Sequence, residues 1–137
     1  MPYDPRIHHR RSIRLKDYDY SLDGAYFVTI CTQNRAMLFG SVAGCEMRPN
    51  EAGTLIQRTW DELPGHYPDV ETDAFQLMPN HLHGIVVLSP SEDADENQDS
   101  CRTSLFDLMR SFKSLTTTLY GTGVRENRWP RYDGKLW

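Results

Sequence analysis

The sequence predicts an α+β domain, with an antiparallel sheet and two helices on one face. Two observations indicate this class: short β-branched and aromatic runs typical of strands, and two longer segments with apolar residues at helical spacing. They alternate in the order strand, helix, strand, strand, helix. With 137 residues, of which 39% are hydrophobic, the chain is long enough to bury one core. We therefore expect a single compact domain.

The three expected strands are segments that favour extended backbone. Residues 25–32 include an aromatic and β-branched run and follow an Asp-Gly pair. Residues 73–78 and 81–88 are separated by Pro79-Asn80, which favours a tight reversal and predicts a hairpin. Residues 40–49, between the first strand and the first helix, are expected to form a link.

The two expected helices are amphipathic. The first begins after the N-cap Asn50, ends at Pro64-Gly65, and has an apolar face made of Ala52, Leu55, Ile56, Trp60 and Leu63. The second begins at Ser104, with Asp107 completing a capping pattern, and ends at Gly121. Its apolar stripe is expected to contain Leu105, Leu108, Met109, Phe112, Leu115 and Leu119. The resulting order β-α-β-β-α, with at most one short further strand, is the ferredoxin-like arrangement.

Two segments lack the pattern of core elements. Residues 1–24 have no apolar periodicity and are rich in Arg, His, Asp and Tyr, which predicts a basic N-terminal arm preceding a domain at residues 25–137. Residues 89–100 contain five acids and no apolar residue larger than alanine. Such a segment buries too little surface to offset the entropy of ordering, so we expect a mobile acidic loop.

Charge is distributed unevenly along the chain. The formal net charge is −4, yet residues 1–16 carry five basic residues against one acid, and residues 102–137 carry seven against three. The segment between them holds fifteen acids and three basic residues. Basic ends around an acidic middle are typical of a one-sided electrostatic surface, so nucleic acid remains a candidate partner.

Composition also limits the class of protein. No apolar run is long enough to cross a bilayer and no secretory signal is recognisable, so we expect no membrane association and a cytoplasmic location. The three cysteines, Cys31, Cys45 and Cys101, form no paired spacing. This pattern argues against a disulfide framework or a thiolate zinc site.

His81 and His83 stand two residues apart on a predicted strand. Alternation along a strand places both imidazoles on one face, with Leu82 on the other. Two ring nitrogens side by side can hold a divalent cation and leave positions open for substrate oxygens, as Lewis-acid chemistry on a phosphate requires. The alternative is that two polar residues share an exposed strand face by chance.

The segment Leu77 to Val86, with sequence LMPNHLHGIV, resembles the histidine-hydrophobe-histidine motif of the tyrosine HUH transposases. The resemblance to the REP-associated branch of that family covers nearly the whole chain, and further matching segments are RRSIRL at residues 10–15, YDY at 18–20, GAYFVT at 24–29, NEAG at 50–53 and RSFKS at 110–114. It implies a dimeric domain that recognises structured single-stranded DNA, such as hairpins of repetitive extragenic palindromes. It also implies Mg²⁺ or Mn²⁺ held by His81 and His83.

In the family that this sequence resembles, a tyrosine attacks the scissile phosphate and forms a covalent phosphotyrosine, which permits strand cleavage and rejoining. That tyrosine follows a Leu-Trp pair, whereas this sequence stops at Leu136-Trp137. The resemblance therefore implies a nucleophile and a later metal-completing residue beyond the end, and a domain that is incomplete at its C-terminus. Tyr120 and Tyr132 are the substitutes within the chain, with packing or base stacking as their alternative roles.

Basic residues in two regions are candidates for binding DNA. Arg10, Arg11 and Arg14 of the arm stand close to His8, His9, Tyr18 and Tyr20, which combines phosphate-pairing charges with rings for stacking. Arg110, Lys113 and Thr117 fall on the predicted polar face of the second helix, where they either meet phosphates or form a solvated surface.

Three functions remain open at this point. The first is a transposase-like domain that processes DNA, and the second is a non-catalytic binder of single-stranded DNA. The third is a metal-dependent hydrolase of small phosphate esters, which uses the same histidines but gives the basic arm no role. Loss of hairpin affinity on deleting residues 1–16 would argue against this hydrolase.

Overall fold

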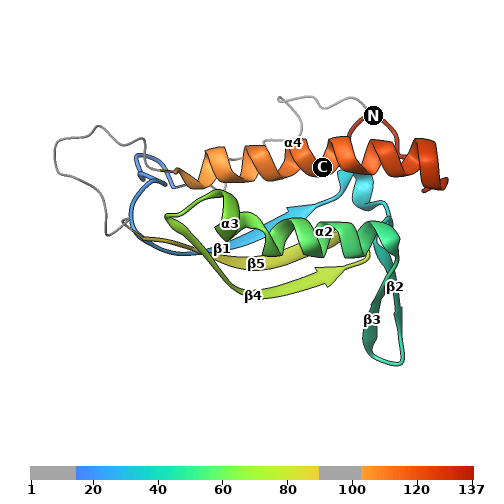
Figure 1. Cartoon of the computed structure of the whole chain (residues 1–137). Helices are drawn as coiled ribbons and strands as arrows, with labels where there is room; N and C mark the ends of the chain where they lie inside the picture. Colours follow the sequence, from blue (N-terminus) through green and yellow to red (C-terminus); the bar gives the residue numbers. More distant parts are fainter. Residues whose placement is uncertain (1–14, 90–102) are drawn as a thin grey trace, which may run out of the picture.

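The computed structural model describes residues 15–89 and 103–137 and confirms the predicted α+β class, as Figure 1 shows. The predicted acidic loop lies outside the described residues except for Ser89. In chain order the elements are β1 (Gly24–Cys31), the short 3-10 turn η1 (Gln33–Arg35), β2 (Gly40–Ala43), β3 (Glu46–Pro49), α2 (Glu51–Asp61), α3 (Leu63–His66), β4 (Val70–Met78), β5 (His81–Leu88) and α4 (Leu105–Asn127).

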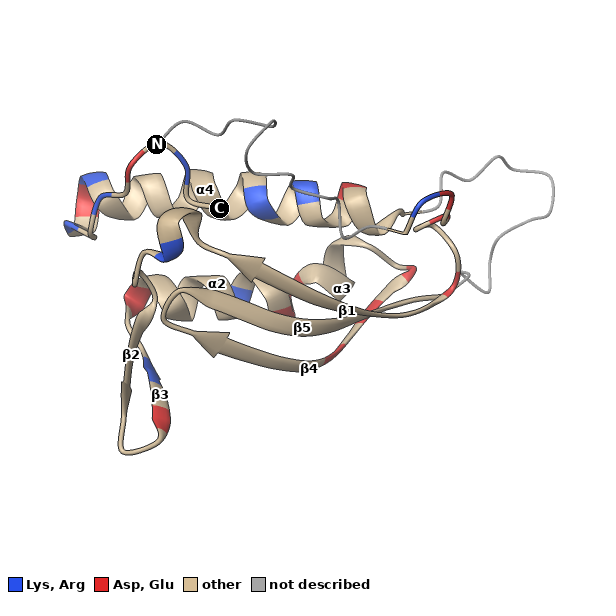
Figure 2. Ribbon diagram, turned by 180° about the vertical axis from the view of Figure 1, so that it is seen from behind, with Lys and Arg blue, Asp and Glu red and all other residues tan. Residues whose placement is uncertain are grey.

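The main sheet has the order β1-β5-β4, and both strand pairs are antiparallel. The helices α2, α3 and α4 lie on one side of it, and no described helix covers the opposite face, which is turned to the viewer in Figure 2 and is called the open face below. This is the ferredoxin-like arrangement with β5 in the centre. The further strand that the sequence allows does not form in residues 128–137.

The core lies between the inner face of this sheet and the helices. All five apolar residues predicted for the first helix and its end are buried, and Asn50 caps α2 by accepting a 2.8 Å hydrogen bond from the Gly53 amide. Trp60 is fully buried, with its ring centroid 5.2 Å from that of Phe75 and 5.6 Å from that of Phe112. On β5, Gly84 provides the space for this indole, because a Cβ there would lie 2.7 Å from Cη2 of Trp60.

The helix α4 differs from its prediction in length and in the face it buries. Its N-cap is Ser104 as predicted, and the Ser104 hydroxyl accepts a 3.1 Å hydrogen bond from the Asp107 amide. The predicted end at Gly121 is wrong, because the helix continues to Asn127 and ends where Arg128 adopts a left-handed conformation. Its buried residues are Leu108, Phe112, Thr116, Tyr120 and Gly123.

The buried face of α4 therefore departs from a purely apolar pattern. Leu115, predicted to face the core, is exposed, and Thr116 takes a core position instead. Burial of its hydroxyl is possible because the hydroxyl donates to the Phe112 carbonyl at 2.7 Å and accepts from the Trp137 indole N–H at 2.9 Å. These bonds satisfy a polar group whose burial would otherwise destabilise the fold.

Residues 40–49 form a β-hairpin rather than a simple link. β2 and β3 pair in antiparallel fashion and project from the domain (Figure 1). Gly44 and Cys45 both have positive φ, as the reversal between two short strands requires. Two further boundaries are corrected: Pro64-Gly65 lies inside the short helix α3, and β4 begins at Val70, with an irregularity between Thr72 and Phe75.

The described part of the predicted arm packs against the domain. The ring of Tyr20 lies 4.8 Å from that of Phe106, and the Tyr20 carbonyl accepts a 3.0 Å hydrogen bond from the Leu105 amide at the start of α4. Tyr18 contacts Tyr20 edge to face, at 4.9 Å between centroids. Residues 15–23 are thus fixed beside α4 by aromatic contacts, while residues 1–14 lie outside the described residues.

Candidate metal and nucleic-acid site

The paired histidines lie on the central strand β5, on the sheet face that is open in Figure 2. Alternate residues of this strand are buried toward the helices, namely Leu82, Gly84, Val86 and Leu88. His81 and His83 belong to the other, half-buried set, and their ring centroids lie 4.9 Å apart. The two imidazoles therefore share one accessible face, as their spacing predicts.

Hydrogen bonds orient both rings through their Nδ1 atoms. Nδ1 of His81 lies 2.7 Å from Oδ1 of Asn80, and an amide oxygen can only accept, so Nδ1 carries the hydrogen. The Asn80 amide is itself oriented by a 3.5 Å contact from its Nδ2 to the Arg35 carbonyl. Nδ1 of His83 lies 2.9 Å from the Thr29 hydroxyl on β1. For His81 this leaves Nε2 as the atom to coordinate a metal, and for His83 the same holds in the tautomer in which Nδ1 donates to the Thr29 hydroxyl. Such outer partners are of the kind that orient metal-binding histidines.

The electrostatics around His81 favour its neutral form. Burial lowers the pKa of His81 below its usual 6.5, and the nearby His83 and Arg35 lower it further. A neutral imidazole retains the lone pair that a cation needs. The environment of His81 therefore suits a ligand better than a charged hydrogen-bond donor.

We expect His81 to titrate with a midpoint below 6.5, as measured from its ring proton shifts by NMR. Because the folded pKa is depressed relative to the unfolded chain, the stability linked to this group is present above pH 6.5 and is lost as the pH falls through the lower folded value. Arg35→Gln should move the midpoint up, whereas Arg48→Gln on β3 should leave it unchanged. A wild-type midpoint at or above 6.5 would contradict this electrostatic picture.

The two rings line a surface pocket of about 290 Å³. Its other lining residues come from β1, from η1 and from the turn before β5, namely Thr29, Cys31, Arg35 and Asn80. Within residues 15–89 and 103–137, no third His, Cys, Asp or Glu joins the histidines to form a cluster of three. The residues present fit a divalent cation held by two imidazoles, with its other positions left to water or phosphate oxygens.

Two neighbours of the pocket were missed by sequence reasoning. Arg35 reaches it because Asn34 and Arg35 both adopt positive φ, which turns the chain back toward β5. Phe27 lies on β1, is 70% exposed, and stacks on His83 with 5.5 Å between ring centroids. The pairing of Thr29 with His83 places these residues together, and strand register cannot be read from an isolated strand.

Of the predicted DNA-binding residues, the two that the structure describes, Arg110 and Lys113, do not line this pocket. Arg10, Arg11 and Arg14 lie outside the described residues. Arg110 and Lys113 are exposed on α4, and Lys113 lines a separate groove with the C-terminal tail. The structure therefore provides two distinct surfaces, the histidine face of the sheet and the outer side of α4.

Of the two substitute tyrosines, Tyr120 takes a core position, whereas Tyr132 is half-buried. Tyr120 is fully buried, donates a 2.7 Å hydrogen bond to the Pro130 carbonyl, and packs edge to face on Tyr132 at 5.6 Å. Burial, followed by the charge of Tyr132, raises the pKa of Tyr120 to about 12, so its phenolate is strongly disfavoured. Of the two roles considered for Tyr120, the structure supports packing.

Comparison with known proteins assigns no activity. No family model matches the sequence. The chain is 48% identical over 84 residues to an uncharacterized protein of Haemophilus influenzae (strain ATCC 51907 / DSM 11121 / KW20 / Rd), a match covering 61% of this chain and 47% of that relative. The match thus spans about half the length of the relative. Among the described residues, no helix has the length and apolar character needed to cross a membrane.

Proposed function

We propose that the chain is a transposase-like protein that binds structured single-stranded DNA, of the REP-hairpin type, and holds Mg²⁺ or Mn²⁺ at His81 and His83. The observation that carries the proposal is the pair of imidazoles on an open sheet face, with each Nδ1 engaged and each Nε2 left for a ligand. The resemblance to the REP-associated transposases adds the DNA substrate, a homodimer and a cytoplasmic location.

The surroundings of the pair are suited to a DNA phosphate. A bound divalent cation would act as a Lewis acid on a phosphodiester. Asn80 and Thr29 orient the two rings, and the guanidinium of Arg35 lines the same pocket, where it can pair with a phosphate oxygen. The exposed ring of Phe27 beside His83 offers a surface on which an unpaired base can stack.

Strand cleavage and rejoining through a phosphotyrosine is the reaction that the resemblance to the REP-associated transposases implies. A non-catalytic DNA binder is the second candidate, and one observation favours it: within the described residues, no tyrosine lines the histidine pocket. The two candidates differ in a single product, a covalent protein–DNA adduct that survives denaturation. We expect no such adduct from this chain alone with a labelled hairpin and Mn²⁺.

The binding proposal is tested with a fluorescent DNA hairpin that carries a single-stranded flank. We expect wild-type protein to bind it more tightly than a blunt duplex of equal length, with affinity that falls as salt is raised. Phe27→Ala should weaken hairpin binding by about 1–3 kcal/mol, the usual contribution of a base–aromatic stack. Fluorescence anisotropy at fixed Mn²⁺ measures both effects.

The matched control is Val42→Ala, which removes an exposed apolar side chain from the β-hairpin of β2 and β3. It should leave DNA affinity unchanged. Equal affinity for hairpin and blunt duplex would argue against recognition of single-stranded DNA. If Phe27→Ala binds the DNA hairpin as tightly as wild-type protein does, the ring of Phe27 and the sheet face around it are not part of the DNA interface.

A further inference from the structure

A groove runs along the outer side of α4, bounded by the C-terminal tail. Lys113, Thr117, Gly121 and Arg125 follow one another at spacings of four, so they share one face of the helix. From the first to the last this row spans about 18 Å at the usual helical rise. The tail returns beside the row, which makes the second wall of the groove.

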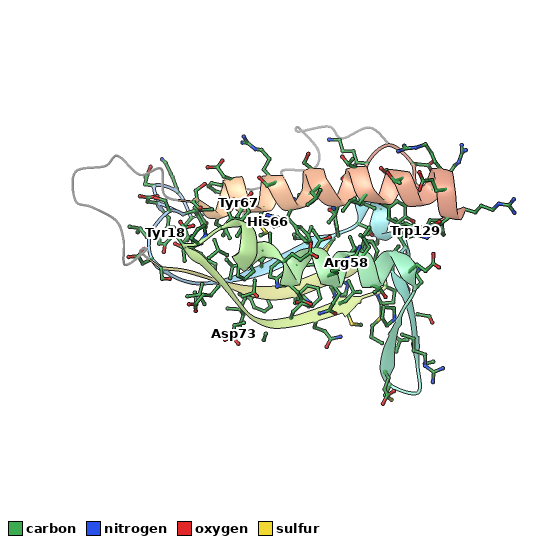
Figure 3. The ribbon with its side chains drawn as sticks, viewed as in Figure 1. Tyr18, Arg58, His66, Tyr67, Asp73 and Trp129 are labelled. Carbon is green, nitrogen blue, oxygen red and sulfur yellow. The ribbon has the colours of Figure 1, made fainter. Side chains whose placement is uncertain are left out.

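The tail is held in place by specific contacts. Leu136 is fully buried, and its carbonyl accepts a 2.9 Å hydrogen bond from the Gln33 amide. The Trp137 indole N–H donates to Thr116, and Tyr132 packs on Tyr120. Just after the end of α4, the Trp129 indole N–H donates a 2.8 Å hydrogen bond to Glu51 in the first turn of α2. Figure 3 labels Trp129 near the start of α2. The groove is therefore a fixed feature of the fold.

The groove consists of two adjoining pockets of about 360 Å³ each, which share Tyr132. One is lined by Lys113, Lys135 and the hydroxyls of Ser114, Thr117 and Thr118. The other is lined by Arg125 and Arg131. No carboxylate is among the described residues that line either pocket. Figure 2 shows both blue and red segments on α4, so the basic character belongs to the residues that line the groove and not to the whole helix.

The arrangement of these groups fits a linear polyanion. Four cations along an extended groove can each meet a different phosphate. The hydroxyls of Thr117 and Thr118 donate to the Lys113 and Ser114 carbonyls, so the hydroxyl in this pocket that can donate to a phosphate oxygen is that of Ser114. An anionic lipid surface would instead favour exposed apolar side chains around the basic residues, whereas Leu136 is buried in the groove wall. The charge complementarity thus favours a nucleic-acid strand.

We propose that the α4–tail groove binds the phosphodiester backbone of single-stranded DNA, as a contact separate from the histidine pocket and independent of the metal. This inference rests on the proposed function, since it takes the same DNA as ligand. It adds Arg125, Arg131 and Lys135 to the expected interface. The sequence alone had indicated Arg110, Lys113 and Thr117 on this side. Contacts to phosphates position a strand without reading its bases.

The test is the salt dependence of binding to a labelled dT oligonucleotide in EDTA. Arg131→Gln/Lys135→Gln should lower the magnitude of the slope of log K against log [salt] by about 1.4, or about 0.7 for each lost phosphate contact. The matched control, Arg48→Gln/Arg58→Gln, removes two exposed charges elsewhere and should keep the wild-type slope. The charge-conserving Arg131→Lys/Lys135→Arg should also keep it. Equal melting temperatures would show that all variants fold.

The outcomes separate this inference from the proposed function. If wild-type protein binds the hairpin and the groove variant retains the full slope, the groove inference is overturned while the proposed function stands. If wild-type protein binds no single-stranded DNA, both are overturned. Vesicles of phosphatidylserine and phosphatidylcholine provide a further arm: binding to them that depends on the groove, with DNA binding unaffected by the variant, would overturn the groove inference in favour of a lipid headgroup.

Discussion

Replacing His81 and His83 together with alanine is expected to abolish specific Mn²⁺ binding by the chain. The two imidazoles are the side chains that the open face of β5 offers to a cation, with Nδ1 of each already engaged. Loss of an outer-shell partner alone typically weakens a metal site by about 10–100-fold, so removal of both ligands should exceed about 100-fold. Isothermal titration calorimetry above pH 7, where His81 is neutral, measures the effect.

Two further variants make this experiment specific. Asn80→Ala keeps both imidazoles but removes the acceptor for Nδ1 of His81, so an intermediate loss of about 10–100-fold is expected. His66→Ala removes an exposed imidazole in α3, and it should leave Mn²⁺ affinity unchanged. Retention of wild-type affinity by the double histidine variant would place the metal elsewhere and remove the main support for the proposed function.

Gly84→Ala is expected to destabilise the fold by about 3 kcal/mol, the upper end of the usual cost of overpacking a core. The added Cβ would overlap the six-membered ring of Trp60. That ring is fully buried between Phe75 and Phe112, so it cannot shift toward solvent. Urea unfolding followed by circular dichroism measures the change in the free energy of unfolding.

Gly65→Ala in α3 is the matched control, because a Cβ there meets no atom within 4 Å and its φ is not positive. It should be neutral or stabilising by up to about 1 kcal/mol. The clash is isolated by a double-mutant cycle: Gly84→Ala should cost less in a Trp60→Leu background than in wild type. Equal stability of Gly84→Ala and wild-type protein would show that the strand and the indole are less tightly packed than the structure indicates.

Elements with strong local signals are the ones that the sequence predicted well. The cap at Asn50 and the apolar spacing through Trp60 are contained within a dozen residues, and they led to the start and buried face of α2. β5 has its predicted bounds because Pro79-Asn80 precedes it and alternation runs along it. The same alternation was enough to place His81 and His83 on one side.

Other features depended on contacts between distant segments. The hairpin of β2 and β3 was missed because each strand has four residues and Gly44-Cys45 is not a common turn pair. α4 continues beyond Gly121 because Tyr120 and Gly123 pack against the returning tail, where Gly123 leaves room for Trp129. Thr116 replaces Leu115 in the core because Trp137, twenty-one residues later, satisfies its hydroxyl.

By itself, the sequence determined the class of the fold, the capped starts of the helices and the shared face of the two histidines. Each of these depends on residues that are near one another along a single element. Only the tertiary structure decided that no described helix covers this face, that Thr29, Arg35 and Phe27 lie beside the histidines, and that the tail forms a wall of a basic groove on α4. The physical reason is that backbone periodicity is local, whereas coverage of a face, strand register and groove walls arise from packing between segments far apart in the chain.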